Sequence, residues 1–360
     1  MMQREPSEAL RTRPTATVVI PCYNYGHFLP ASVASALDQE GVDVDVVIVD
    51  DASPDGSVEV ARALAAADPR ISLIAHETNK GHILTYNDGL ATATGDYVVL
   101  LSADDLLTKD ALSRALALME RHPEVGLVYG PVVIFDEVPP AEKSAPSEEW
   151  VVWGGREWAD RLFRYGVNVI KSPEAVVRTS VLRQVGLYDP EHPHAGDLQM
   201  WLRIAAVSDV GYLPGVVQAC YRQHTQNMHS AVFGTDQVRG MVTDLQHRLD
   251  AFTTAASSFG EAERLATQIR LTSAREAIDL ASRAYVWGFT ETWPVDEFVE
   301  FARQQDPAVD ETTAGRAFRR RRTVGPRLSR RNPLFVLRER RLTGARRAAE
   351  EHVVALGLPG

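Results

Sequence analysis

The chain has 360 residues, 45% of them hydrophobic and 24% charged, a composition typical of a globular protein with one large domain and an appended piece, or two modest domains. No run approaches about 18 apolar residues, and the polar N-terminus lacks an apolar core, so we expect neither a membrane span nor a signal peptide. The two cysteines, Cys22 and Cys220, have no ligand-like spacing, and they fit a reduced, cytoplasmic setting.

The net charge of −10 is distributed unevenly. Residues 316–360 contain 13 arginines and only three glutamates, which leaves a charge of −20 on the rest of the chain. Such a tail has two interpretations: a solvated, disordered segment, or, over 316–347, a peripheral contact with anionic lipid at the inner face of a membrane. Nucleic acid is not expected, because the body is acidic and only Phe318 and Phe335 lie among the arginines.

The first third of the chain alternates between strand and helix patterns. Residues 1–14 are polar and contain two prolines, so they are predicted to be a flexible leader. Apolar, β-branched runs predict strands over 15–20, 44–49, 71–75 and 97–101, and helical patterns lie between and after them, over about 29–37, 56–67, 83–93 and 110–121. This alternation predicts an α/β fold with a mostly parallel, doubly wound sheet and helices on both faces.

The pattern changes after Val125. Short strands and a loop rich in proline and glutamate lead through a mixed segment to about Tyr221, and from Asp236 the spacing of apolar residues becomes helical. We therefore predict a domain over 15–230 with halves 15–125 and 126–230, a helical C-terminal region over 231–315, and the arginine-rich tail. The helical region offers a surface for a homodimer.

Polar residues follow three of the predicted strands directly. The first strand ends in Pro21-Cys22-Tyr23-Asn24, the second in Asp50-Asp51-Ala52-Ser53, and the fourth in Ser102-Ala103-Asp104-Asp105. Ligands of open parallel sheets bind beyond the carboxyl ends of the strands. One such polar segment is an ordinary loop or helix cap, but three polar segments at one edge of the sheet predict a binding site.

The adjacent acids Asp104 and Asp105 indicate a cation. Neighbouring carboxylates repel each other unless a cation or donor lies between them, and a hard divalent ion such as Mg²⁺ or Mn²⁺ prefers oxygen ligands and phosphates. The alternative is that Asp105 caps the next helix while Asp104 is solvated. The glycine-rich motifs of dinucleotide and triphosphate binders are absent, as is the serine hydrolase motif, so a phosphate-bearing ligand would be held mainly by the metal.

At these residues the sequence resembles the family 2 glycosyltransferases, which have a GT-A fold. The resemblance covers about 15–230 and includes the three strand ends, Asn79-Lys80-Gly81, and the segment from Gly186 to Arg203. It departs from the family at Ser102, where many members have a third Asp.

The resemblance implies an inverting, metal-assisted transfer from a nucleotide sugar, with UDP favoured, to a carbohydrate, lipid-linked or small-molecule acceptor. The first half would hold the nucleotide and the second half the acceptor. Asp197 would be the general base, Asp51 would meet the nucleotide base, Asp104 the ribose and metal, and Asp105 the metal. The other implied nucleotide contacts are Pro21, Cys22, Tyr23, Asn24, Ser53, Lys80, Ser102 and Ala103.

Several further residues have two interpretations. His224 is either a third metal ligand or a capping residue, and Arg222 either a phosphate clamp or a surface cation. The His192 and His194 pair lacks the further ligands of a zinc site and fits an acceptor-side loop. Trp201 either stacks on a sugar or packs in the core, and Trp153 and Trp158 are undecided.

Two other functions stay open from the sequence. A catalytically inactive binding or scaffold protein of the same fold is permitted by Ser102. A nucleotidyltransferase of similar architecture would need a cationic, glycine-rich loop after the first strand, and the segment Cys22-Tyr23-Asn24-Tyr25-Gly26 has no cation.

Overall fold

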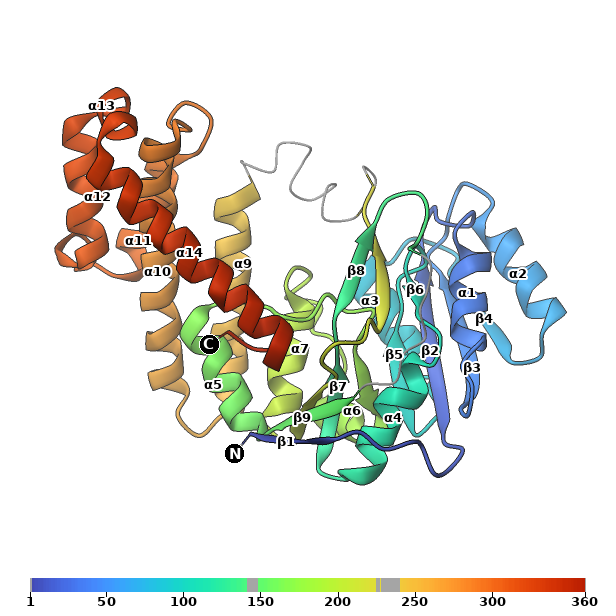
Figure 1. Ribbon diagram of the computed structural model, residues 1–360. Helices are drawn as coiled ribbons and strands as arrows, with labels where there is room; N and C mark the ends of the chain where they lie inside the picture. The colour runs from blue at the N-terminus through green and yellow to red at the C-terminus, as the bar shows by residue number, and fades with distance from the viewer. Residues whose placement is uncertain (1, 141–147, 225–226, 228–239, 360) are drawn as a thin grey trace. The chain divides into compact units, whose positions relative to one another are not determined.

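The computed structural model describes residues 2–140, 148–224, 227 and 240–359 and is drawn in Figure 1. The chain divides into two compact units. The first comprises residues 1–159, 168–223 and 354–358, and the second comprises 160–167, 224–353 and 359–360. Within the described ranges, no helix combines the length and the apolar character needed to cross a bilayer.

The first unit is built on a nine-stranded sheet with the order β1-β9-β11-β7-β10-β5-β2-β3-β4. The strands β5, β2, β3 and β4 are parallel, whereas β10 enters antiparallel between β5 and β7. The strands are β1 Gln3–Pro6, β2 Thr15–Cys22, β3 Asp43–Asp50, β4 Ile71–Ala75, β5 Tyr97–Leu100, β7 Val125–Tyr129, β9 Glu149–Trp153, β10 Val176–Arg178 and β11 Asp209–Tyr212. A second, three-stranded sheet joins β6 Leu106–Leu107, β12 Ala219–Arg222 and β8 Val132–Phe135.

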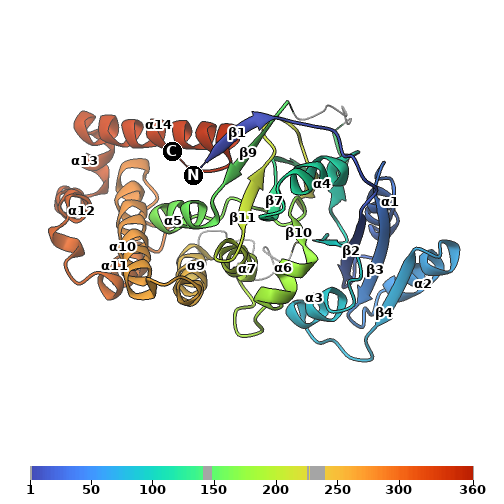
Figure 2. The ribbon, with the colours of Figure 1, turned by 90° about the horizontal axis from the view of Figure 1, so that it is seen from below.

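Helices cover both faces of the large sheet (Figure 2). The helices are α1 Leu29–Leu37, α2 Ser57–Ala67, α3 His82–Leu90, α4 Ala111–Arg121, α5 Gly155–Tyr165, α6 Thr179–Val185 and α7 Gly196–Ala205. The helices α1, α2 and α4 share a core with one face of the strands, and α3 and α7 pack on the other. The α/β architecture predicted from the sequence is therefore confirmed.

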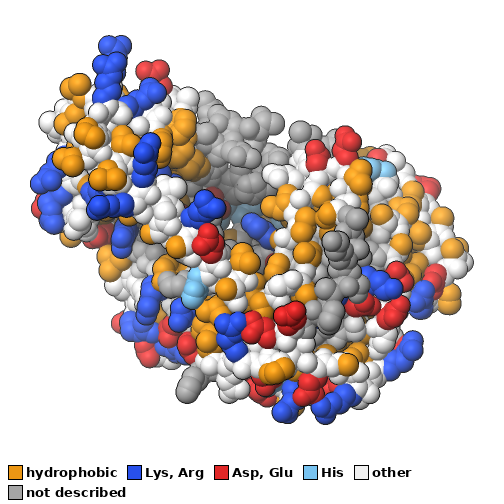
Figure 3. Space-filling view, in the orientation of Figure 1, with side chains coloured by type: hydrophobic (Ala, Val, Ile, Leu, Met, Phe, Trp, Pro, Cys, Tyr) orange, Lys and Arg blue, Asp and Glu red, His pale blue; other side chains and the backbone are white. Residues whose placement is uncertain are grey.

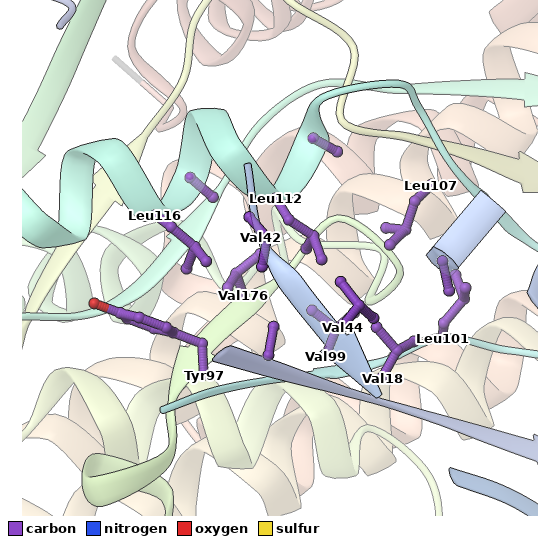
Figure 4. Close-up of a cluster of buried hydrophobic side chains, with 14 of the residues drawn as sticks. Val18, Val42, Val44, Tyr97, Val99, Leu101, Leu107, Leu112, Leu116 and Val176 are labelled. Carbon is purple, nitrogen blue, oxygen red and sulfur yellow. The ribbon is translucent and has the colours of Figure 1, made fainter. Parts of the chain in front are cut away.

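Alternation along the strands fixes which side chains meet each helix layer. Val18 and Val99 belong to one buried cluster with Leu112 and Leu116 of α4 (Figure 4). On the opposite face a Cβ on Gly89 would lie 2.4 Å from a methyl group of Val19. Only glycine allows α3 to approach the sheet this closely, and α3 follows the loop that contacts Asp51.

The N-terminal segment is more ordered than the flexible leader that we predicted. Gln3–Pro6 form β1, which pairs antiparallel with β9 at the edge of the sheet. The strand is polar because it is an exposed edge, which is why its composition resembles that of a loop. A cavity of about 760 Å³ lies beside Pro6 and Val216 and is lined by none of the predicted site residues.

The second unit is helical. It contains α9 Gly240–Ala255, α10 Ala262–Trp287, α11 Val295–Gln305, α12 Thr313–Val324 and α13 Pro326–Arg331, with the short turns η1 Ala256–Ser258 and η2 Val309–Glu311; most of α14 Pro333–Leu356 also belongs to it. The interpretation of 316–360 as a disordered tail is therefore wrong for its described residues. One of its arginines, Arg321, is buried and paired with buried Glu339 at 3.2 Å.

The end of the chain returns to the first unit. The hydroxyl of Tyr129 donates to the carbonyl of Gly357 at 2.7 Å, and Trp153 Nε1 donates to Leu356 O at 3.1 Å. Leu358 is fully buried. Trp153, Trp158 and Trp201 are all buried as well, so each of these tryptophans is a core residue.

Candidate active site

The strand ends of β2 and β3 are joined by direct hydrogen bonds. Cys22 pairs with Asp50 at the end of the ladder, the amide of Asp51 donates to Cys22 O at 2.9 Å, and the amide of Asn24 donates to Ser53 Oγ at 3.0 Å. The first two predicted polar loops therefore lie side by side at one edge of the sheet. Because β5 is parallel to β2 on its other side, the loop after β5 opens at the same edge.

Asp51 organises the loop that precedes α3. Its carboxylate accepts hydrogen bonds from His76 Nδ1 at 2.8 Å and from the amides of Lys80 and Gly81 at 2.8 and 2.9 Å. Burial raises the pKa of this acid, but the bonds from His76, Lys80 and Gly81 outweigh burial and hold the pKa below its usual value. The side chain therefore stays ionised, and its contact with a nucleotide base stays a prediction.

Two buried oxygens at this edge have no hydrogen-bond partner within the described residues. They are Asn24 Oδ1 and Asp50 Oδ2. Asn24 also has a positive φ of 62°, and Ala52 has a φ of 57°, a backbone region that is costly for residues other than glycine. Strained loops with unpaired acceptors are suited to a ligand that brings N–H donors.

The acid pair after β5 is buried. Asp104 is 5% exposed and Asp105 only 1%. Burial and then the neighbouring Asp104 charge raise the pKa of Asp105 well above its usual value, although the amide of Arg222 donates to its Oδ1 at 2.8 Å. Burial and then the charge of Asp104 also raise the pKa of Tyr25, which places the first loop near the acid pair.

These two carboxylates fit a hard divalent cation. Their shared burial concentrates negative charge, and a cation would relieve the repulsion that raises the pKa of Asp105. Within residues 2–140, 148–224, 227 and 240–359, no group of three histidines, cysteines or acids is arranged to hold a metal. Divalent ions of this kind are commonly held by one or two carboxylates together with water and substrate phosphates.

The side chain of Arg222 is committed to the loops around the acid pair. Its Nε donates to Asp104 O at 3.0 Å, and its Nη1 donates to the carbonyls of Asp136 and Glu137 at 3.0 and 3.2 Å. The guanidinium also lies over the rings of Phe28 and Phe135. These contacts favour a role in positioning Asp104 and Asp105 over the predicted phosphate clamp.

Asp197 is held by two hydroxyl groups at the start of α7. Tyr188 Oη donates to its Oδ1 at 2.8 Å, and Ser172 Oγ donates to its Oδ2. Burial raises the pKa of Asp197 above its usual value in spite of these two bonds. A carboxylate in this setting is a stronger proton acceptor than an exposed one.

Tyr86 links Asp197 to the acid pair. Burial raises the pKa of this phenol, and next in size come the charges of Asp197, Asp104 and Asp105. Its ring packs edge-on against Tyr188, with centroids 5.7 Å apart. The two predicted groups, metal ligands and base, therefore act electrostatically on one tyrosine side chain.

Glu174 is a residue that the sequence analysis did not identify. It is 3% exposed, and its Oε1 accepts from the amide of Lys171 at 2.6 Å. Among the residues that the structure describes, its Oε2 has no hydrogen-bond partner. Burial, with a smaller contribution from the charge of Asp197, raises its pKa to about 7. Only the unusual presence of an acid in the short apolar run after Pro173 could have indicated it.

The comparisons with known proteins agree with this arrangement of motifs. The sequence profile described as Glycosyl transferase family 2 matches residues 17–186, which include all three strand-end loops. Residues 17–186 form a glycosyl transferase family 2 domain. The matched family region ends before Asp197, so the role of that residue stays a prediction.

Relatives of this family 2 chain include the "Putative glycosyltransferase EpsE" of Bacillus subtilis (strain 168), 33% identical over 129 residues, which are 36% of this chain and 46% of that protein. The chain spans less than half the length of the first curated relatives that it matches.

Two solved proteins share the fold of the family 2 chain. The crystal structure of S. aureus TarS 1–349 has a TM-score of 0.53 at 14% identity and aligns with 85% of this chain and 91% of that one. The mannosyltransferase PcManGT from Pyrobaculum calidifontis, in complex with GDP-Man and Mn²⁺, has a TM-score of 0.51 at 19% identity over 89% of this chain and 90% of that one. At these identities the likeness shows the GT-A fold alone.

The remaining predicted nucleotide contacts differ in exposure. Cys22 and Ala103 are buried in the core, so only their backbone can face a ligand of the family 2 chain; burial also raises the pKa of the Cys22 thiol to about 11. Tyr23 is 46% exposed, Pro21, Ser53 and Ser102 are half-buried, and Lys80 Nζ bonds Asp88 at 2.7 Å.

The predicted histidines lie in two places. His192 Nδ1 bonds Asp189 Oδ2 at 2.9 Å, and the ring of His194 lies 6.3 Å from that of His82. His224 belongs to the second unit, where its amide donates to Asn227 Oδ1. Its role as a metal ligand stays a prediction.

Proposed function

We propose that this protein is an inverting glycosyltransferase, which moves a sugar from a nucleoside diphosphate to an acceptor hydroxyl. The observation that carries the proposal is Asp197: a carboxylate with a raised pKa, oriented by two hydroxyls, whose charge acts on the same Tyr86 as the charges of Asp104 and Asp105. Neighbours of the same fold support the donor class, since TarS is known in complex with UDP and PcManGT with GDP-Man. We favour a uridine donor.

Asp197 would act as the general base. The acceptor hydroxyl transfers its proton to the Asp197 carboxylate while its oxygen forms a bond to the anomeric carbon. The bond from that carbon to the diphosphate oxygen breaks, and its electron pair leaves with the nucleoside diphosphate. Because attack and departure occur on opposite faces, one displacement inverts the configuration.

Asp104 and Asp105 would hold the divalent metal, either Mn²⁺ or Mg²⁺. When bound, this ion would offset the negative charge that develops on the departing diphosphate. Arg222 would keep both acids in place through the Asp104 carbonyl and the Asp105 carboxylate. Asn24 Oδ1 at the same edge, which has no partner among the described residues, would accept a hydrogen bond from the nucleotide.

The acceptor half of the site does not distinguish between classes of acceptor. A carbohydrate, a lipid-linked sugar and a small molecule all present the hydroxyl that the proposed base needs. Tyr86, Tyr188 and His82 bring aromatic rings close to Asp197, and such rings stack on sugar faces. A homodimer through the helical unit stays a prediction.

Asp197→Asn tests the proposal most directly. It keeps the size of the side chain but removes the basic oxygen, so turnover with donor, acceptor and Mn²⁺ should fall about a thousandfold, while the affinity for UDP measured by calorimetry should change less than about twofold. Asp45→Asn is the matched control, because Asp45 is also a half-buried acid with a pKa raised by burial and lies at the opposite end of the sheet.

Two outcomes would contradict the proposal. Equal loss of UDP affinity and turnover in Asp197→Asn would place this acid in binding rather than proton transfer. Absence of any metal-dependent release of UDP from a panel of UDP-sugars, with UDP still bound tightly, would indicate an inactive binding protein of the same fold.

A further inference from the structure

The short helix α13 presents three arginines and a leucine to solvent. Its one buried side chain is Ser329, whose hydroxyl donates to Arg321 O at 3.1 Å. The other side chains from Arg327 to Arg331 are exposed, and Leu328 is 62% exposed. One exposed leucine is ordinary on a protein surface, and Leu328 becomes informative only together with other exposed apolar side chains around it.

Exposed aromatic side chains lie beside this helix. The helix α10 ends at Trp287, and a Cβ on the next residue, Gly288, would lie 2.9 Å from the guanidinium carbon of Arg330. Arg330 therefore rests directly on the turn that carries Trp287 and Phe289, both of which are 42% exposed. Phe289 is held in place by stacking on Trp293, with centroids 5.1 Å apart.

Apolar side chains continue on both sides of α13. Val324, at the end of α12, is 38% exposed, and Leu334 and Leu337, in the first turns of α14, are 74% and 49% exposed. We call this surface the α13 patch and define it as Trp287, Phe289, Val324, Arg327, Leu328, Arg330, Arg331, Leu334 and Leu337. Figure 3 shows arginine and hydrophobic side chains interspersed over the helices of this unit.

No acid in the described part of the chain neutralises the three arginines of the patch. From Thr312 to Arg338 the chain has nine arginines and no acidic residue. Arg319, Arg321 and Arg322 pair with acids elsewhere in the unit, but in the part of the chain that the structure describes, Arg327, Arg330 and Arg331 form no ion pair. Glu291 is the one acid on the turn from 288 to 294.

We propose that the α13 patch binds the surface of an anionic lipid bilayer. Its arginines would meet lipid phosphates, while Leu328, Trp287 and Phe289 would enter the boundary between headgroups and acyl chains. A nucleic acid would use the arginines but leave the leucines and aromatic rings in water, and a second copy of the patch would repel the first. The α13 patch does not include any residue of the proposed transfer site.

Vesicle sedimentation of the full chain tests this inference. The protein should bind vesicles of phosphatidylglycerol mixed with phosphatidylcholine, should not bind phosphatidylcholine alone, and should be released by added salt. The triple variant R327Q/R330Q/R331Q should bind anionic vesicles roughly 100-fold more weakly, since each arginine near such a surface contributes about fivefold. Separately, L328S/L334S should weaken binding at every salt concentration.

The matched control is R62Q/R70Q/R303Q, which removes the same charge from exposed arginines that are paired with acids elsewhere. It should bind vesicles like the parent chain. Tryptophan emission gives a second measurement that needs no arginine variant: vesicles should shift the emission to the blue, and Trp287→Phe should abolish the shift.

The inference is overturned by binding that is equal for both vesicle types, by no binding to either, or by loss of binding in the control as large as in the triple variant. A protein that binds a DNA or RNA duplex but no vesicle would also overturn it. Metal-dependent UDP release should be unchanged in every one of these variants, so failure here is separate from failure of the proposed transfer reaction.

Discussion

Ser172 donates its hydroxyl to Asp197 Oδ2 from a left-handed backbone with a φ of 103°. A residue with a Cβ is strained in this region. Ser172 therefore combines a strained backbone with the hydrogen bond that orients the proposed base. Nearby, Ala175 donates its amide to Ser172 O at 3.0 Å, and Glu174 accepts from Lys171 N. The turn is therefore fixed by its own hydrogen bonds, which hold Ser172 against Asp197.

Two substitutions of Ser172 separate the bond from the strain. Both Ser172→Ala and Ser172→Gly remove the hydroxyl, so we expect each to lower turnover roughly tenfold, the loss of one hydrogen bond to a charged group. Glycine adopts this backbone conformation without strain, so the free energy of unfolding of Ser172→Gly should be about 1 kcal/mol higher than that of Ser172→Ala. Urea denaturation measures the second effect, and equal stability of the two variants would show that the turn is not strained.

Tyr188→Phe should change the pH dependence of the reaction. The Tyr188 hydroxyl stabilises the charged form of Asp197 and so lowers its pKa; without it the pKa rises further. The acid limb of the kcat/KM profile should therefore move to higher pH, by roughly one unit. Tyr212→Phe removes a hydroxyl that bonds Val354 O instead, and its profile should match that of the parent chain. A limb that stays in place in Tyr188→Phe would exclude Asp197 as the titrating base.

Glu174→Gln should alter the pH dependence of stability. The pKa of Glu174 is about 7 in the folded chain, against an ordinary value of 4.5, so the stability that its neutral form provides is present below pH 4.5 and lost as the pH rises through 7. Glutamine never ionises. Relative to the parent chain, the variant should therefore gain up to about 3 kcal/mol of unfolding free energy between acid and neutral pH.

Urea denaturation across this pH range measures the change. The difference at one pH also contains the cost of the buried amide nitrogen of glutamine, so the slope with pH is the informative quantity. Glu297→Gln, at an exposed glutamate in the first turn of α11, is the control for the substitution itself. A flat difference for Glu174→Gln would mean that Glu174 is ionised throughout the range.

The strand-end loops could be predicted from the sequence because the signal is local. The run from Val44 to Val49 is apolar, and Asp50 and Asp51 follow it directly, so parallel pairing alone brings them to the edge where Cys22 and Asn24 lie. Asp104 and Asp105 carry the same local signal, because they closely follow the apolar run 97–101.

The residues around Asp197 could not be predicted, because distant pairings position them. Val176–Arg178 form a strand of only three residues that enters between β5 and β7, and this insertion places Ser172 and Glu174 beside α7. A segment of three residues is too short to show the hydrophobic periodicity that identifies a strand. In the sequence, Arg321 is likewise indistinguishable from the other arginines of 316–360, because its partner Glu339 lies on another helix.

Asp105→Asn tests the metal assignment without the transfer reaction. Asparagine keeps an oxygen that accepts from the amide of Arg222, but it removes one of two adjacent buried charges. In chelator the variant should melt about 2 °C above the parent chain, because the repulsion that raises the pKa of Asp105 is gone. Added Mn²⁺ should raise the melting temperature of the parent chain and of Asp45→Asn but not that of Asp105→Asn.

UDP affinity gives a second measurement of the same assignment. The affinity of Asp105→Asn for UDP should be roughly tenfold lower than that of the parent chain with Mn²⁺ present, and should equal that of the parent chain in chelator. The same loss of affinity with chelator would mean that Asp105 contacts the nucleotide itself rather than a metal.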